Sequence, residues 1–168
     1  MRKIDLYKLS MSLKVFVDTE FTNFIDIHLI SIGMAAASGE EFYAEVPYPS
    51  DSCSEFVREA VIPLLGQVPD AFCSIDDLYL KITNWLKIIR SGEENVEICF
   101  DYQTDWDLFA TALDGRVPPW CQLRMVSRNI NELLRYKFHK QNNLPEHHAL
   151  YDARANRYAF RERAPISV

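Results

Sequence analysis

Apolar positions in the first third of the chain follow the pattern expected of β-strands. The run KVFVDTEF, from Lys14 to Phe21, is rich in β-branched and aromatic residues, which predicts a strand buried on both faces. We expect this strand to lie at the centre of a sheet. Two further strands are predicted at 28–36 and 41–46, and the Ser38-Gly39 turn between them favours antiparallel pairing. The chain therefore opens with a predicted three-stranded meander.

The remaining two thirds alternate between helical and strand periods. Ser74, followed by Asp77 and a stripe of Leu, Ile and Trp, is typical of a capped helix start. Gly115 is a natural helix end. Helices are expected at 54–65, 74–90, about 105–113, 130–140 and about 148–163, with strands at 96–100 and 122–126. This alternation predicts an α/β fold.

Length and composition indicate one domain. The chain has 168 residues, 48% of them hydrophobic, which is enough for one sizeable core, so we assign 1–168 to a single domain. Residues 1–10 precede Met11 and are a candidate N-terminal extension. The four cysteines form no CxxC pair, and neither a secretory signal nor an 18-residue apolar run accompanies them. We therefore expect a reduced, soluble, cytoplasmic protein with no membrane association.

Charge is distributed unevenly along the chain. The net charge is -6, yet residues 116–168 hold 10 Lys and Arg against 4 Asp and Glu, while residues 1–115 hold 8 against 20. For most of the basic residues individually, a solvated helix or loop position is the simpler interpretation. Collectively they are a candidate surface for a phosphate backbone.

Two carboxylates stand on the predicted central strand. Asp18 and Glu20 are two residues apart, so the strand period places both side chains on one face, roughly 7 Å apart. Carboxylates on a strand otherwise made of Val and Phe are costly to bury unless a cation or hydrogen bonds compensate them. The alternative, in which the strand ends at Val17 and both acids are solvated, is weakened because the strand pattern continues into Phe21. The two acids can converge on one ion.

A second acidic segment, DYQTDWDLF, follows the predicted strand at 96–100. Asp105 shares a helix face with Leu108, Phe109 and Ala112, which makes it the core-facing candidate. Asp107 lies on a different face and suits a solvated first turn, where the helix dipole favours an acid. Asp101 is either a hydrogen-bond acceptor that supports the metal ligands or a turn residue.

The third segment, PEHHALYDA, places two histidines before an aspartate. Pro145 suits a helix start, and Asp152 shares a face with alanines that let a helix pack closely on a sheet. His148 stands four residues before Asp152 on the same helix, where it would point towards the sheet or pack at its edge. His147 precedes or opens the helix and is free to swing towards the acids.

Taken together, VDTE, DYQTDWDLF and HHALYDA resemble, in order and spacing, the three sequence blocks of the DEDDh 3'-5' exonucleases of the ribonuclease H-like superfamily. The resemblance spans Val15 to about Phe160. It implies a ribonuclease H-like mixed β-sheet flanked by α-helices. It also implies that four acids bind two divalent cations, Mg²⁺ or Mn²⁺, and that a histidine is the general base. The four acids are Asp18, Glu20, Asp105 and Asp152, and the histidine is His147.

The second block departs from the family pattern. This chain has Gln103 and the pair Trp106-Asp107 where the family usually shows an Asn and a Phe-Asp pair. The difference leaves open a register in which Asp107 is the metal ligand, although the helix-face argument favours Asp105.

The resemblance implies hydrolysis of phosphodiester bonds at the 3' ends of single-stranded nucleic acid. RNA is favoured because small stand-alone exoribonucleases of this family look closest. The alternatives are a 3'-5' exodeoxyribonuclease or proofreading activity and a non-catalytic nucleic-acid-binding module.

Phe21 and Thr22 follow Glu20 directly and are candidate contacts for the terminal nucleotide, with Phe21 as a stacking surface, although core packing explains Phe21 equally well. A homodimer is a candidate assembly.

Overall fold

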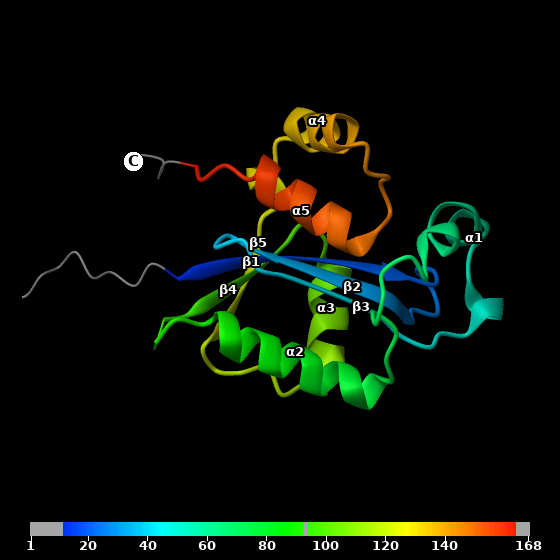
Figure 1. The fold of residues 1–168 in the computed structure, drawn as a ribbon, viewed down its shortest axis with the longest axis horizontal. Coiled ribbons are helices and arrows are strands. Elements are labelled where there is room, and N and C mark those ends of the chain that lie inside the picture. The colour runs from blue at the N-terminus through cyan, green and yellow to red at the C-terminus, as the bar shows by residue number, and fades with distance from the viewer. Residues whose placement is uncertain (1–11, 93, 164–168) are drawn as a thin grey trace, which may run out of the picture.

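A five-stranded mixed sheet organises the protein. The computed structural model describes residues 12–92 and 94–163, so the candidate extension at 1–10 lies outside the described part. The strand order is β3-β2-β1-β4-β5, with β1 at the centre as predicted (Figure 1). β1 pairs antiparallel with β2, and β2 with β3, whereas β4 runs parallel to both β1 and β5. The strands are β1 Leu13–Phe21, β2 Leu29–Ala36, β3 Glu41–Glu45, β4 Val96–Phe100 and β5 Cys121–Met125.

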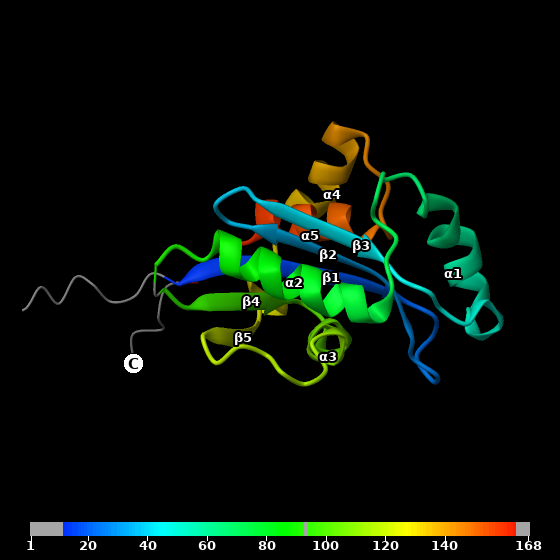
Figure 2. The same cartoon turned by 60° about the horizontal axis from the view of Figure 1, so that its bottom comes forward.

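Helices cover both faces of this sheet. α2 and α3 lie on one face and α4 and α5 on the other, while α1 lies beyond one end of the strands (Figure 1). Turning the molecule shows α2 crossing in front of the sheet (Figure 2). The helices are α1 Glu55–Ala60, α2 Ile75–Ile89, α3 Gln103–Ala112, α4 Glu132–Asn142 and α5 Ala149–Ala159, with short 3₁₀ turns at Ser50–Ser52, Ile62–Leu64 and Ser127–Asn129. In the described part of the chain, none of the helices has the length and apolar character that crossing a membrane requires.

Two predicted helices are shorter in the structure. The one expected at 54–65 ends as α1 at Ala60 and continues only as a 3₁₀ turn, because Pro63 has no amide hydrogen to extend an α-helix. The one expected at 148–163 ends at Ala159, because Phe160 becomes extended and bridges Ile130. By contrast, Ser74 caps α2 as expected, accepting a hydrogen bond of 3.1 Å from the Asp77 amide.

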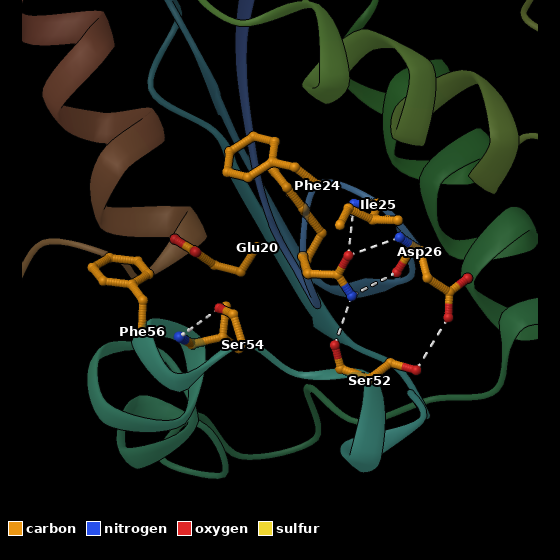
Figure 3. Close-up of a pocket in the computed structure, with 10 residues that line it drawn as sticks. Glu20, Phe24, Ile25, Asp26, Ser52, Ser54 and Phe56 are labelled. Carbon is orange, nitrogen blue, oxygen red and sulfur yellow. Dashed lines mark hydrogen bonds between the residues drawn. The ribbon is translucent and has the colours of Figure 1, made fainter.

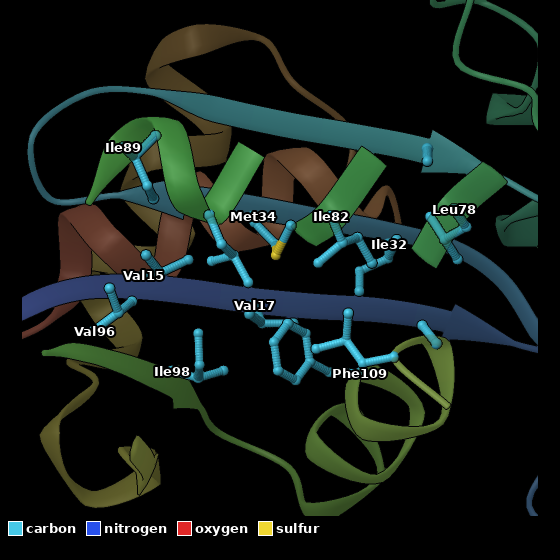
Figure 4. Packing of buried hydrophobic residues seen from close by; sticks show 14 of the residues in the cluster. Val15, Val17, Ile32, Met34, Leu78, Ile82, Ile89, Val96, Ile98 and Phe109 are labelled. Atoms are coloured by element: carbon cyan, nitrogen blue, oxygen red, sulfur yellow. The ribbon is translucent and has the colours of Figure 1, made fainter. Parts of the chain in front are cut away.

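The two faces of β1 supply two parts of the core. Val15 and Val17 pack with α2 and α3 in the main cluster (Figure 4), and Phe16 on the opposite face contacts Phe160 at a centroid distance of 5.3 Å. Gly33 on β2 lets α5 approach closely, since a Cβ there would lie 2.3 Å from the carbonyl carbon of Ala149. Because Gly33 pairs with Asp18 on β1, this contact brings the start of α5 over the acidic end of the central strand.

Candidate active site

The acids and the histidine singled out from the sequence converge at the carboxyl end of β1. One ligand atom each from Asp18, Asp101 and Asp105 lies within 4.8 Å of the others. A second group with the same spacing consists of Glu20, His147 and Asp152. The two groups adjoin because Asp18 and Glu20 stand two residues apart on β1. Together they form the acidic cluster of the site. A cavity of about 230 Å³ opens at this place, lined by Asp18, Arg135, His139, Glu146, His147 and Asp152.

Asp105 is held rigidly in the first turn of α3. Its side chain is buried, and its Oδ1 accepts hydrogen bonds from the Thr19 amide at 3.0 Å and the Thr19 hydroxyl at 2.6 Å. Asp107 is exposed and accepts a hydrogen bond from Gln103 instead. The structure therefore places Asp105 in the acidic cluster and leaves Asp107 outside it, as the helix-face argument predicted.

Asp101 links the acidic cluster to α4 and α5. Its Oδ2 accepts a hydrogen bond of 2.8 Å from Arg135 on α4, and its Oδ1 accepts one of 3.2 Å from Asn156 on α5. Both oxygens are therefore engaged while the carboxylate also stays close to Asp18. Asp101 therefore fits the role of a hydrogen-bond acceptor that supports the site, and not that of a simple turn residue.

The adjacent histidines have different environments. His147 precedes α5 with a φ of 64°, and its amide donates a hydrogen bond of 2.9 Å to Asp152 Oδ2. Its ring meets Phe56 edge to face, with centroids 4.8 Å apart. His148 is buried and stacks against Tyr43 at 4.5 Å and Tyr151 at 3.9 Å, and burial lowers its pKa. His148 is a packing residue, whereas the ring of His147 belongs to the acidic cluster.

The carboxylates raise one another's pKa values. Desolvation raises the pKa of Asp18 well above its usual range, and the nearby Asp105, Asp152 and Glu20 raise it further. Desolvation, followed by Asp152 and Asp105, raises the pKa of Glu20 to about 8. Desolvation also raises the pKa of Asp105 to about 7. Such a set of oxygen donors suits hard divalent cations, which would compensate the repulsion.

These shifts predict a pH dependence for the metal-free protein. Because the pKa of Glu20 is about 8 in the folded chain against 4.5 in the unfolded one, the folded state binds more protons in that window. The contribution of Glu20 to the free energy of unfolding is therefore largest below its unfolded pKa of 4.5, and it is lost as the pH rises through its folded pKa of about 8. We expect the melting temperature in EDTA to fall between pH 5 and pH 8 (roughly the window those pKa values span) and to fall less in Glu20→Gln. Equal slopes in the two proteins would contradict this electrostatic description.

A larger pocket of about 670 Å³ adjoins Glu20 (Figure 3). One wall is the loop that follows β1, and the other is the segment leading into α1. Phe21, Phe24 and Phe56 make its lining mainly apolar, and Phe24 meets Phe21 and Tyr102 edge to face at 5.2 and 6.1 Å. Phe21 thus lines the pocket. The volume is in the usual range of small-molecule sites.

Hydrogen bonds brace the loop that forms the first wall. Asn23 Oδ1 accepts from the amides of Ile25 and Asp26, while Asn23 Nδ2 donates to the carbonyls of Asp26 and Ser52 (Figure 3). Thr22 does not line the pocket with its side chain: it is fully buried and donates to the Asp26 carbonyl at 2.7 Å. The Thr22 side chain therefore braces the loop, and a Thr22 contact with the terminal nucleotide stays a prediction.

Ion pairs account for much of the basic excess in the last third of the chain. Arg154 and Arg157 both pair with Glu41. Arg124 pairs with Glu97 and Glu162, and Arg135 pairs with Asp101 and Glu132. These four arginines mainly stabilise contacts within the fold, which reduces the surface available for phosphate contacts.

Some residues that line the site are not indicated by the sequence patterns. Arg135 and His139 reach the cavity from α4, and Phe56 reaches His147 from α1. The only signal for the first two is their i,i+4 spacing, which places them on one helix face. Nothing along the chain marks Phe56 as close to His147.

The sheet order and the flanking helices define a ribonuclease H-like fold. Among solved structures, the chain is similar to the nuclease domain of 3'hExo, a DEDDh family member, bound to rAMP, with a TM-score of 0.58, 13% identity, and 89% of this chain and 90% of that chain covered. It is also similar to a 3'-exonuclease in a structure of the 3'-end specific recognition of histone mRNA stem-loop, with a TM-score of 0.58, 12% identity, and 87% and 78% covered. Cell-death related nuclease 4 matches with a TM-score of 0.50 and 14% identity, over 87% of this chain and 61% of that one. No family model and no curated protein matches the sequence.

Proposed function

We propose that the protein is a metal-dependent 3'-5' exonuclease that hydrolyses phosphodiester bonds at the 3' ends of single-stranded nucleic acid, with RNA favoured. The observation that carries the proposal is the convergence of Asp18, Glu20, Asp105, His147 and Asp152 at one end of β1. Residues from a strand, two helices and a loop meet there, although burying so many acids together is unfavourable. A site of this kind is usually retained for its chemistry.

The four acids and the histidine have distinct tasks in this mechanism. Asp18, Glu20, Asp105 and Asp152 would hold two divalent cations, which supply charge stabilisation to the phosphate and to the departing 3'-oxygen. His147 accepts the proton of the attacking water at its ring, since imidazole is the usual general base near neutral pH. Its position outside α5 leaves the ring beside Glu20 and Asp152 rather than in the packed core.

The apolar pocket supports action at a chain end. Its two walls are joined by hydrogen bonds from Asn23 to the Ser52 carbonyl at 2.6 Å and from the Ser52 hydroxyl to Asp26 at 3.1 Å. In Figure 3 these bonds lie on the side of the pocket away from Glu20. A terminal nucleoside can therefore enter from the Glu20 side and stack on Phe24, while a strand that continued through the pocket would meet the joined walls.

RNA is the favoured substrate because two of the similar solved structures are described with rAMP and with a histone mRNA stem-loop. A 3'-5' exodeoxyribonuclease is the second candidate, and the same acidic site would serve it equally well. The test is to incubate the purified protein with single-stranded RNA and DNA of one sequence, each with Mg²⁺, Mn²⁺ or EDTA. Release of 5'-mononucleotides from the 3' end of RNA supports the proposal, and faster digestion of DNA would favour the second candidate. Absence of metal-dependent hydrolysis would leave a non-catalytic binding module.

Phe24 provides a test of the nucleoside pocket. Its side chain is 69% exposed beside Glu20, and a stacked base is worth roughly 1–3 kcal/mol. We expect Phe24→Ala to weaken binding of a short single-stranded RNA about 10-fold in Ca²⁺, measured by fluorescence anisotropy. The matched control is Ile88→Ala on α2, which removes an exposed apolar side chain outside the pocket. Equal affinities in both variants would show that the terminal base binds elsewhere.

A further inference from the structure

α4 carries no residue of the proposed catalytic set, yet it places a buried histidine against that set. His139 is 4% exposed, and its Nε2 lies 3.0 Å from Oδ1 of Asp152 on α5. Its other ring nitrogen, Nδ1, lies 3.2 Å from the carbonyl oxygen of Leu144. A carbonyl oxygen can only accept, so Nδ1 carries a hydrogen, and both ring nitrogens of His139 have partners.

Asp152 is thereby held from two sides. His139 contacts Oδ1, and the His147 amide donates to Oδ2 at 2.9 Å. The second bond belongs to a residue with a φ of 64°, a left-handed backbone that costs energy for a non-glycine residue and persists only where its surroundings enforce it. The carboxylate of Asp152 is therefore the point through which α4 acts on the conformation of His147.

We propose that His139 is a positioning residue that fixes the carboxylate of Asp152 and, through it, the backbone of His147. The proposal rests on the proposed function, in which Asp152 is a metal ligand and His147 the base. Supporting partners that orient ligand groups typically contribute 10–100-fold to metal affinity or activity. A residue that only filled space between α4 and α5 would not need two polar contacts, because burying an imidazole is costly compared with burying Leu.

Two substitutions separate the two contacts of His139. The amide nitrogen of Gln reaches about as far as Nε2, so His139→Gln keeps a polar contact with Asp152. The shorter Asn places its amide near the position of Nδ1, so His139→Asn keeps the donor for Leu144 and loses the contact with Asp152. Gln141→Ala, an exposed residue on the same helix, is the matched control.

The readouts do not depend on nuclease activity alone. In the metal-free protein we expect hydrogen exchange of the His147 amide, followed by NMR, to accelerate in His139→Asn and to stay near the wild-type rate in His139→Gln. Mn²⁺ affinity, measured by calorimetry, should fall about 10-fold or more in His139→Asn and less than about 3-fold in His139→Gln. Single-turnover cleavage should follow the same order, with Gln141→Ala unchanged throughout.

Equal His147 exchange and equal Mn²⁺ affinity in the Asn and Gln variants would overturn the positioning role, whatever their melting temperatures. A difference between the two variants in both measurements supports it even if no nucleic acid is hydrolysed, in which case only the proposed function fails. Loss of folding in His139→Asn alone, with His139→Gln folded, would be reported by the exchange of the α5 amides as a whole. That result would also overturn the proposal, because it would make His139 a residue of general stability.

Discussion

Asp18→Asn is expected to lower Mg²⁺- or Mn²⁺-dependent hydrolysis by about 1000-fold or more while the protein stays folded. The reason is that Asp18 is surrounded by Asp105, Asp152 and Glu20, so a cation bound between them loses a charged ligand on which transition-state stabilisation depends. The same substitution removes a carboxylate whose pKa is raised by burial and by its acidic neighbours. We therefore expect the melting temperature in EDTA to rise even though activity is lost. Initial rates and thermal unfolding measured on one preparation check both parts.

The matched pair Asp105→Asn and Asp107→Asn tests the second block in the same assays. Asp105 is buried against Thr19, whereas the carboxylate of Asp107 is exposed and accepts a hydrogen bond from Gln103. Asp105→Asn should be inactive and Asp107→Asn nearly as active as the wild type. The reverse pattern would place the ligand two residues further along α3. Full activity in Asp18→Asn would rule out the two-metal mechanism.

The sequence was sufficient to predict the sheet and the acids on it. A strand of period two places Asp18 and Glu20 on one face whatever the rest of the fold does, and helical periodicity separates Asp105 from Asp107. The alanines on α5 predicted its close approach to the sheet, and Gly33 on β2 provides the space for it. The sequence patterns that predict these features are local, since each depends on residues within about two turns or one strand.

Contacts between distant segments could not be predicted in this way. The pairing of Asp101 with Arg135 joins residues 34 apart, and no local pattern distinguishes that arginine from the other basic residues of the last third. The pocket next to Glu20 depends on Asn23 reaching Ser52, which lies 29 residues away. The segment that carries Phe56 was predicted as one helix at 54–65, and its end at Ala60 became evident only in the structure. Site residues from α1 and α4 therefore emerge only once the chain is folded.

His147→Asn is expected to lower the single-turnover cleavage rate by at least about 100-fold, the usual scale for loss of a general base. Asn is the better substitution here because His147 has a φ of 64°, and Asn adopts the left-handed region more readily than Ala. The amide that donates to Asp152 Oδ2 is kept, so the acidic cluster should retain its geometry. The rate of a labelled single-stranded RNA under enzyme excess, together with Mn²⁺ and RNA affinities, separates chemistry from binding. Both affinities should stay within about 3-fold of the wild type, since the four acids are untouched.

The control is the neighbouring histidine. His148→Phe keeps a flat ring between Tyr43 and Tyr151 and removes both ring nitrogens, neither of which has a hydrogen-bond partner among the described residues. A ring that only packs can lose its nitrogens without loss of cleavage, so this variant should cleave at close to the wild-type rate per folded molecule. If His148→Phe is the inactive variant and His147→Asn cleaves normally, the base is His148 and its burial in the structure must be relieved when substrate binds. If instead His147→Asn loses Mn²⁺ affinity in proportion to its rate, His147 acts as a ligand beside Glu20 and Asp152, and another group must take the proton from the water.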